Sequence, residues 1–474
     1  MHRRAGGHRP QQQRRHQQEE KGRTSAPSPS EPPPPAPSAP SAASPRPAAG
    51  AVVAEAGAVV ATYYALEGLY ALAMGLTQSV DDLFLLHAGL SMWSVFLVGA
   101  AFTAALVLFE IPTGVVADTV GRRASVLASL AVRSAGSVAY VAAAWAPAAL
   151  RLVLFCGLKV VMGLGFTFYS GAIDAWLVDA LRVMPDSGGR TLDQVFARGA
   201  AISRLLGLLG MLGGAAMAQG ALGIPFAMRG LLLGCTLVAA AHFMHDTGFS
   251  PTPLTADVYV SKVVEISRAS ARYGWSNKAV RMIMLASFSQ AMLTTWGFYA
   301  WHSHLLTLYG DVHAVWLIGV VSALVSCARS LGNLLVDALI ASGLVRHRTT
   351  VMLGAMPVLS LTAIALGRST SFAQALCWLM CLMATMGVVD PVRQAFLHRE
   401  IPSGQRATVI SFQQMFVGGG SVLGQLTLGY CANVASIPAA YVVGGCLSLL
   451  SLPPIFLLRS FRRHTDAFVP TTSP

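Results

Sequence analysis

The sequence predicts an all-α polytopic membrane protein, with twelve transmembrane helices in two pseudo-symmetric six-helix halves. Three observations lead to this prediction. Hydrophobic residues make up 54% of the chain and charged residues only 11%, a composition too apolar for a soluble core. Apolar stretches of about twenty residues, the length that crosses a bilayer, recur from residue 57 to residue 460. Basic residues gather in alternate connections between these stretches.

The first fifty residues differ from the rest of the chain. They hold eleven of its 25 prolines, together with glutamine runs, and eight Lys or Arg against three Glu. Such a segment has almost nothing apolar to bury, so we expect residues 1–50 to be a disordered tail. About fifty polar residues precede the first span, which is unlike a secretory signal peptide. The excess of basic over acidic residues is therefore explained by the tail and the loops, and we expect no nucleic-acid partner.

Charged, proline-rich and glycine-rich breaks divide the remainder into twelve apolar segments. Each can cross a hydrocarbon layer of about 30 Å as a helix that rises about 1.5 Å per residue. Helices are required because lipid offers backbone groups no partner. The segments are 58–80, 92–117, 124–146, 152–175, 197–219, 227–246, 280–304, 313–338, 349–367, 372–396, 408–430 and 437–459.

The basic residues of the connections indicate which side of the membrane each connection occupies. Eighteen Lys or Arg lie in connections on the same side as the N-terminus, and only Arg151, Arg229 and Arg368 lie on the other. Because basic residues collect on the cytoplasmic side, both termini are expected there. The chain then divides into a tail (1–50), a first half (51–246), a cytoplasmic linker (247–279), a second half (280–460) and a C-terminal tail (461–474).

The two halves carry related sequences. Residues 171–190 align without gaps on residues 387–406, with six identities that include Asp174 with Asp390 and Arg190 with Arg406. A weaker similarity pairs the connection after the second span with the one after the eighth, at nearly the same offset. Two similarities in the same order, at the same span boundaries, indicate duplicated six-helix units.

The connection after the second span carries a motif of known type. It reads Gly-x-x-x-Asp-x-x-Gly-Arg-Arg, formed by Gly114, Asp118, Gly121, Arg122 and Arg123. With the twelve spans and the long central linker, this motif resembles that of the major facilitator superfamily of transporters. The resemblance covers roughly residues 57–460 and departs at Thr119, where the family has arginine. It implies that Asp118 binds the end of a helix in the other half, and that the arginines help to lock a cytoplasmic gate.

Polar residues recur every three or four positions along four of the spans, so each set lies on one helix face. These are the first, fourth, seventh and tenth spans, the four that line the central cavity in the family that the chain resembles. The residues that we assign to the cavity are Tyr63, Tyr70, Gln78, Gln290, Thr294, Trp301 and Gln394.

Two charged residues on these faces are candidates for transport and proton coupling. Glu67, in the first span, is the preferred proton site, because a carboxyl in a low-dielectric layer can load and release a proton. A structural hydrogen bond to a neighbouring tyrosine is the alternative. Lys159 stands where the family's fourth-span motif has arginine, and it could pair with Glu67 or with an anionic substrate. A plain interhelical pair is equally compatible with its position.

Further charges lie near the cytoplasmic ends of the spans, where we expect gating. Asp174 and Asp390 occupy related positions in the two halves, with Arg190 and Arg406 as candidate partners, although helix capping is an alternative role. Glu110 precedes Pro112 and the loop motif, so we expect it to be a partner of that latch.

These features favour a secondary transporter of a small organic solute, working by alternating access with proton-coupled efflux. A solute importer or facilitator of the same fold, or a non-transporting membrane sensor, is the alternative. We expect no enzyme activity, cofactor or metal site, because the histidines are scattered and the cysteines form no Cys-x-x-Cys pair. The expected partners are the solute, protons and the lipid bilayer, and the expected form is a monomer in the plasma membrane.

Overall fold

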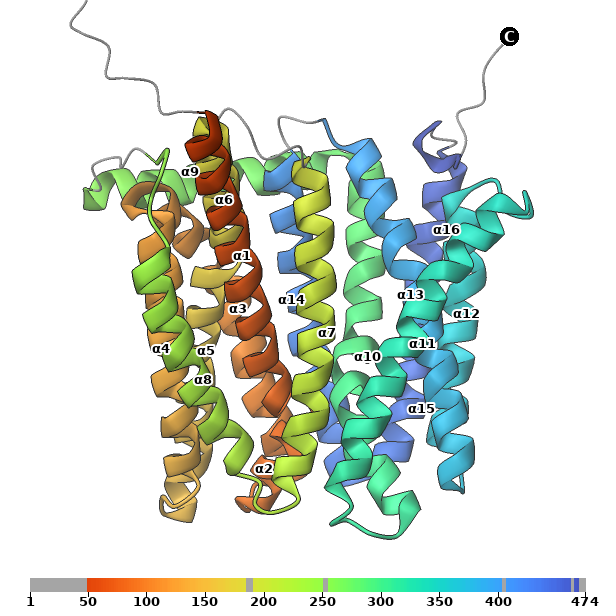
Figure 1. Ribbon diagram of the computed structural model, residues 1–474. Coiled ribbons are helices and arrows are strands. Elements are labelled where there is room, and N and C mark those ends of the chain that lie inside the picture. The colour runs from red at the N-terminus through yellow and green to blue at the C-terminus, as the bar shows by residue number, and fades with distance from the viewer. Residues whose placement is uncertain (1–48, 185–190, 250–254, 403–405, 462–463, 469–474) are drawn as a thin grey trace, which may run out of the picture. The chain divides into compact units, whose positions relative to one another are not determined.

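The computed structural model describes residues 49–468, except for 185–190, 250–254, 403–405 and 462–463. These residues form one compact unit of helices that run side by side (Figure 1). The fold class expected from the sequence is confirmed, since the described chain is helical throughout apart from turns and one isolated bridge between His347 and Ala467.

The first half contributes six spanning helices, of which the fourth is broken. They are α1 (Ala49–Gln78), α3 (Met92–Val120), α4 (Arg122–Ala143), α5 (Ala148–Tyr169) continued by α6 (Ala172–Val183), α7 (Leu192–Ala218) and α8 (Ile224–Phe243), with the short α2 (Asp81–His87) between the first two. The linker forms α9 (Ala256–Ser276).

The second half follows the same plan. Its helices are α10 (Lys278–Tyr309), α11 (Val315–Ala341), α12 (Arg348–Gly367), α13 (Phe372–Glu400), α14 (Arg406–Val434) and α15 (Ile437–Ser448), which η2 (Leu449–Ser451) joins to α16 (Leu452–Ser460), before the final turn η3 (His464–Asp466). Among the described residues, ten helical segments are apolar and long enough to cross a membrane. Of the twelve expected spans, α10 and α14 are not among these ten, and they carry the buried polar residues Gln290 and Gln425.

The repeated segments take different conformations in the two halves. Gly171 has a φ of +74° and separates α5 from α6. Its counterpart Gly387 lies inside α13, where a Cβ atom would be 2.1 Å from the carbonyl oxygen of Arg329. Glycine therefore permits a left-handed turn in one half and close contact between α11 and α13 in the other.

The arginine-bearing connections lie at one end of the helices, which we call the basic face. In the first half, Arg123 donates to the carbonyl of Ala241 and its backbone N–H to Asp246. In the second, Arg348 donates to the carbonyl of Thr465 near the C-terminus. Figure 1 shows both regions at the end where α9 lies. The sequence expectation that residues 121–123 and 346–348 share one side therefore agrees with the helix arrangement.

The two halves meet mainly along two helix pairs, α3 with α14 and α7 with α11. The first pair is close because Gly99 approaches the side chain of Gln425, and Gln425 donates to Thr103 at 3.0 Å. The second is close because Gly319 lies against Ala215. Small residues of this kind let helix backbones approach in a membrane protein, and they hold the halves around the cavities described next.

Candidate functional site

A central cavity lies between the two halves, near the end that is away from the basic face. It has a volume of about 210 Å³ and is lined mostly by α1, α2, α3, α4, α5 and α8. The second half contributes Tyr299 from α10 and Gln425 from α14. Residues of both halves therefore border one space, as a solute site between rocking halves requires.

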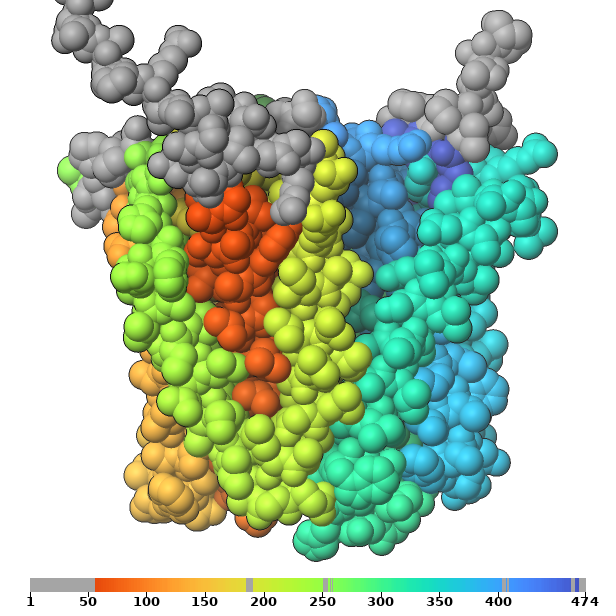
Figure 2. Space-filling model, viewed as in Figure 1, coloured from red at the N-terminus to blue at the C-terminus, as the bar shows by residue number. Residues whose placement is uncertain are grey.

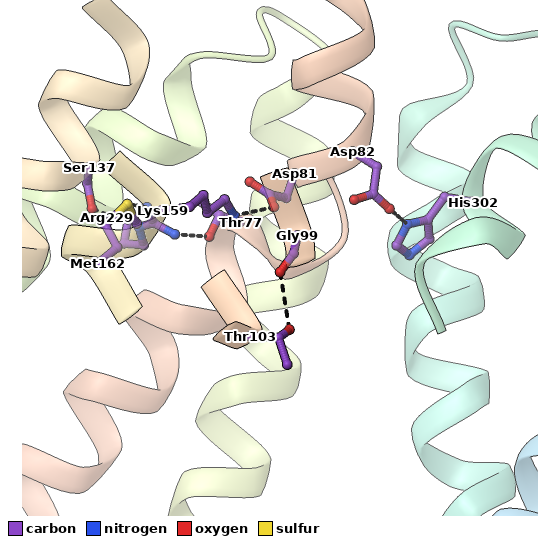
Figure 3. A network of polar contacts seen from close by, with 10 residues as sticks. All are labelled: Thr77, Asp81, Asp82, Gly99, Thr103, Ser137, Lys159, Met162, Arg229 and His302. Atoms are coloured by element: carbon purple, nitrogen blue, oxygen red, sulfur yellow. Dashed lines mark hydrogen bonds and ion pairs between the residues drawn. The ribbon is translucent and has the colours of Figure 1, made fainter. Parts of the chain in front are cut away.

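An ion pair crosses the wall of this cavity. Lys159 Nζ lies 2.5 Å from Asp81 Oδ2 (Figure 3), and the ammonium also stands over the rings of Phe102 and Tyr140, 5.7 and 5.1 Å from their centroids. The suggested pair of Lys159 with Glu67 is not found. Glu67 and Asp81 are fourteen residues apart, which is about 20 Å along a helix, so one lysine side chain cannot serve both.

Two arginines border the same cavity. The guanidinium of Arg133 donates to the carbonyl of Met162 at 3.2 Å and stands over Tyr70 and Phe166. Arg229 donates to Thr77 Oγ1 at 2.6 Å and to Ser137 Oγ at 2.8 Å (Figure 3). Neither makes an ion pair with an acid among the described residues. The contacts of Arg133 instead include a carbonyl and two aromatic faces.

A second cavity, of about 280 Å³, lies within the second half and shares Tyr299 with the first. Gln290 and Thr294 line it, as expected from the polar face of the seventh span. Asp390 pairs there with Arg329 and, at 2.9 Å, with Arg393. Arg393 also donates to Gln290 at 2.9 Å, so one polar chain joins α10, α11 and α13.

Glu67 is held by neutral donors. Tyr169 donates to one of its carboxylate oxygens at 3.1 Å and Ser203 to the other at 3.0 Å. The ring of Tyr169 stacks on that of Tyr70, with centroids 3.7 Å apart. Among the described residues, no Lys, Arg or His lies within ion-pair distance of Glu67. The structure therefore contains the tyrosine hydrogen bond that was the alternative to a proton site, and the two roles are compatible.

The remaining residues assigned to the cavity are divided. Gln78 borders the central cavity, whereas Tyr63 is buried and donates to Asp174 at 2.9 Å. Trp301 packs in the apolar core of the second half, and Gln394 borders neither of the two cavities. Trp301 lines neither cavity in this conformation, because helical periodicity places a residue on a face but does not say whether that face meets a cavity or a neighbouring helix.

The loop motif is bound within its own half. Asp118 pairs with Arg122 one turn away and its side chain is 60% exposed. Arg122 also lies 3.5 Å from Asp179 on α6. The expected contact of Asp118 with a helix of the other half is not present in this conformation. Gly121 has a φ of +138°, and a Cβ there would be 2.9 Å from the carboxylate of Asp246.

The other gating candidates have local partners. The side chain of Glu110 accepts from Ser170 at 3.5 Å and makes no ion pair with Arg122 or Arg123 among the described residues. Asp390 pairs with Arg329 and Arg393 rather than with Arg406, which begins α14. Arg190 lies outside the described residues.

A latch between the halves closes the end opposite the basic face. Asp82 on α2 accepts from His302 on α10 at 3.0 Å, and both side chains are buried (Figure 3). Close by, Ser79 hydrogen-bonds to Ser322 at 3.0 Å, and Gln219 donates to the carbonyl of His313 at 2.8 Å. Sequence reasoning missed this latch, since it considered the histidines only as possible metal ligands. An acid in the short connection after the first span was the available signal.

A lateral cavity of about 1050 Å³ opens between α7 and α11, with α1 at its back. Figure 2 shows the surface hollowed between these two helices toward the basic face. Its walls are largely apolar, with Leu205, Leu208 and Leu331 among them, and Tyr70 lines it. Met74 and Gln78 border both this cavity and the central one, so the two spaces are neighbours.

Comparison with known proteins identifies the fold. The Major Facilitator Superfamily model matches residues 317–471. Over 85% of this chain and 99% of the other, the structure aligns with nucleoside transporter NupG at a TM-score of 0.63 and 14% identity. The human organic anion transporter MFSD10 (TETRAN) aligns over 85% of this chain and 99% of its own, at a TM-score of 0.57 and 17% identity. A D-xylose-proton symporter aligns over 87% of this chain and 99% of its own, at a TM-score of 0.57 and 13% identity. No curated protein matches the sequence.

Proposed function

The fold and the Major Facilitator Superfamily match over residues 317–471 both point to the transporters of that superfamily, and we propose that this chain is a secondary transporter of a small organic solute. The solute would bind in the central cavity, and the two halves would rock around it so that the cavity opens to one side of the membrane at a time. The resemblance stated from the sequence is thereby confirmed, and transport is the function that best fits it.

One observation carries the proposal. The central cavity is bordered by both halves, and hydrogen bonds join the halves at its closed end. They include those of Asp82 with His302, of Ser79 with Ser322 and of Gln219 with the carbonyl of His313. Bonds of this kind can break and re-form as a gate opens and closes, because water can replace either partner.

The arginine distribution supports an orientation for this conformation. Basic loops favour the cytoplasm, so we place the basic face, with both termini, on the cytoplasmic side of the plasma membrane. The latch then closes the outer side. Asp118 pairs with Arg122 of its own half and makes no ion pair with the other half among the described residues, so this contact does not hold the inner side closed. An inward-facing conformation of a monomer accounts for both features.

Proton coupling is the finer part of the proposal. Glu67 is a carboxyl without a cationic partner among the described residues, in a spanning helix. Such a group is costly in lipid unless it is protonated or meets a transported cation. One protein with the same fold is a D-xylose-proton symporter, so proton use is compatible with the fold.

Efflux is our preferred direction, because the large apolar lateral cavity borders the central one and would admit amphipathic solutes from the membrane. An importer or facilitator would use the same site without this route. A non-transporting sensor would bind a solute and show no flux.

A disulfide across the latch tests alternating access. Ser79 and Ser322 are close enough, with Oγ atoms 3.0 Å apart, for cysteines to bond there after small adjustments. The variant Ser79→Cys/Ser322→Cys, in a background without the seven native cysteines, is reconstituted in vesicles. Uptake of a labelled solute panel is measured before and after oxidation.

Oxidation should abolish flux and a reductant should restore it, while each single-cysteine variant keeps its flux under both conditions. Undiminished flux through a fully cross-linked sample would show that this end need not open, and alternating access through the central cavity would be rejected. A pH gradient imposed in the same vesicles separates proton-coupled efflux from import or facilitated diffusion.

A further inference from the structure

The central cavity carries positive charge that the protein does not neutralise. Arg133 and Arg229 are 4% and 5% exposed, and both border the cavity. Their hydrogen bonds go to a carbonyl, two hydroxyls and sulfur atoms. Arginine is rarely buried unless an acid pairs with it, so two such residues at one cavity require an explanation.

The nearest acids are already engaged. Asp81 pairs with Lys159, and Asp82 is bound by His302 (Figure 3). These are the acids that line the central cavity. Neither acid makes an ion pair with Arg133 or Arg229, and the three cationic side chains on the cavity wall, of Lys159, Arg133 and Arg229, outnumber its two carboxylates.

The two arginines act on the same part of the cavity. Both contact Met162, Arg133 through its carbonyl and Arg229 through its sulfur at 3.9 Å. Like charges this close repel each other, and burial strengthens the repulsion because the local dielectric is low. An anion between them would relieve both the repulsion and the lost hydration.

The rest of the cavity suits an apolar body. Phe102, Phe166 and Tyr299 line it, and its volume of about 210 Å³ equals that of about seven water molecules at ~30 Å³ each. Aromatic walls around a few polar anchors are typical of small-molecule sites. Arg presents paired N–H groups that match carboxylate, sulfonate and phosphate oxygens.

We propose that Arg133 and Arg229 form an anion-binding subsite, and that the solute of this protein is a small organic anion with an apolar or aromatic body. That this anion is the transported solute rests on the proposed function, whereas the anion site itself can be tested by binding alone. The carboxylate, sulfonate or phosphate group would accept from both guanidinium groups, and the ring would lie against the aromatic wall.

Removal of an arginine could disturb folding, so the test supplies a competing anion instead. Thr77 already accepts from Arg229 at 2.6 Å. Thr77→Asp places a carboxylate within reach of this guanidinium, and Thr77→Asn is the neutral control of nearly the same size. Binding of benzoate, benzenesulfonate, phenyl phosphate, neutral benzamide and cationic benzylamine is measured on the purified full-length protein by calorimetry and thermal shift.

At least one of the three anions should bind more tightly than benzamide and benzylamine, and the anion that binds best identifies the acid group. Thr77→Asp should weaken that binding by about tenfold or more, the value of a lost charge-assisted hydrogen bond of about 1.4 kcal/mol. Thr77→Asn should change it less than about threefold.

Equal anion affinity in the two variants, no binding of any anion, or a preference for benzylamine would overturn the anion subsite. Flux does not enter these measurements. Anion binding without vesicle transport would therefore leave this inference standing and remove only the proposed transport function.

Discussion

Replacing Glu67 by glutamine should uncouple transport from the proton gradient while the fold survives. Glutamine has the shape of a protonated carboxyl, and it keeps an oxygen acceptor for one of the two hydroxyl groups, of Tyr169 or Ser203, that now donate to Glu67. The other hydroxyl can rotate to accept from the amide. Since no ion pair of Glu67 is lost, we expect the stability to change by no more than about 1 kcal/mol.

The size of the functional effect follows from the gradient. One proton per solute and one pH unit across the membrane provide about 1.36 kcal/mol, which sustains about a tenfold concentration ratio of the solute. Vesicles with a clamped membrane potential and a labelled solute from the panel should reach this ratio with the natural chain. With Glu67→Gln the ratio should fall to about one, while exchange at equal pH on both sides continues.

Glu110→Gln is the matched control. Glu110 is the other glutamate within a spanning helix of the first half, and its one hydrogen bond, to Ser170, is long at 3.5 Å. This variant should keep the tenfold ratio. Retention of that ratio in Glu67→Gln, or its loss in Glu110→Gln alone, would refute Glu67 as the coupling site.

Two further predictions concern the latch and the packing. Burial raises the pKa of Asp82 above its ordinary value of 3.8, against the opposing effect of His302. Protons therefore bind better to the closed latch than to the open one, and protonation of Asp82 favours closure. This stabilisation of the closed latch is lost as the pH rises through the raised pKa of Asp82. Asp82→Asn should remove this pH dependence, which labelling of an outer-side cysteine at pH 4 to 8 would detect or disprove. Gly214→Val places a Cβ 1.9 Å from the Leu76 carbonyl oxygen and should lower stability by about 1–3 kcal/mol, whereas Gly213→Ala, with open space around it, should not; equal melting temperatures would contradict this packing.

Several features of the site could be anticipated from the sequence. The polar faces of the first and seventh spans indicated Gln78, Gln290 and Thr294, and these residues line cavities. Helical periodicity carries this information because lipid excludes polar side chains from one side of each helix. The same periodicity could not separate Trp301, which lies in the core, from residues that meet a cavity.

The partners of the charged residues could not be anticipated. Lys159 pairs with Asp81, and Asp118 pairs within its own half. Each pairing depends on which helices are neighbours and on how far one slides along the other, within a few ångströms. For Asp118 it also depends on which gate is closed, because a rocking protein gives one sequence more than one set of contacts.

The sequence by itself determined the number of spans, their division into two related halves and the gathering of arginines at one face. Those properties follow from hydrophobicity and charge, because the free energy of placing a segment in the bilayer depends on the hydrophobicity and charge of its own residues. Only the tertiary structure decided that Asp82 meets His302 across the halves and that Arg133 and Arg229 border one cavity with no ion pair to an acid among the described residues. Such contacts join residues far apart in the chain, and they exist only where packed helices bring them within hydrogen-bonding distance.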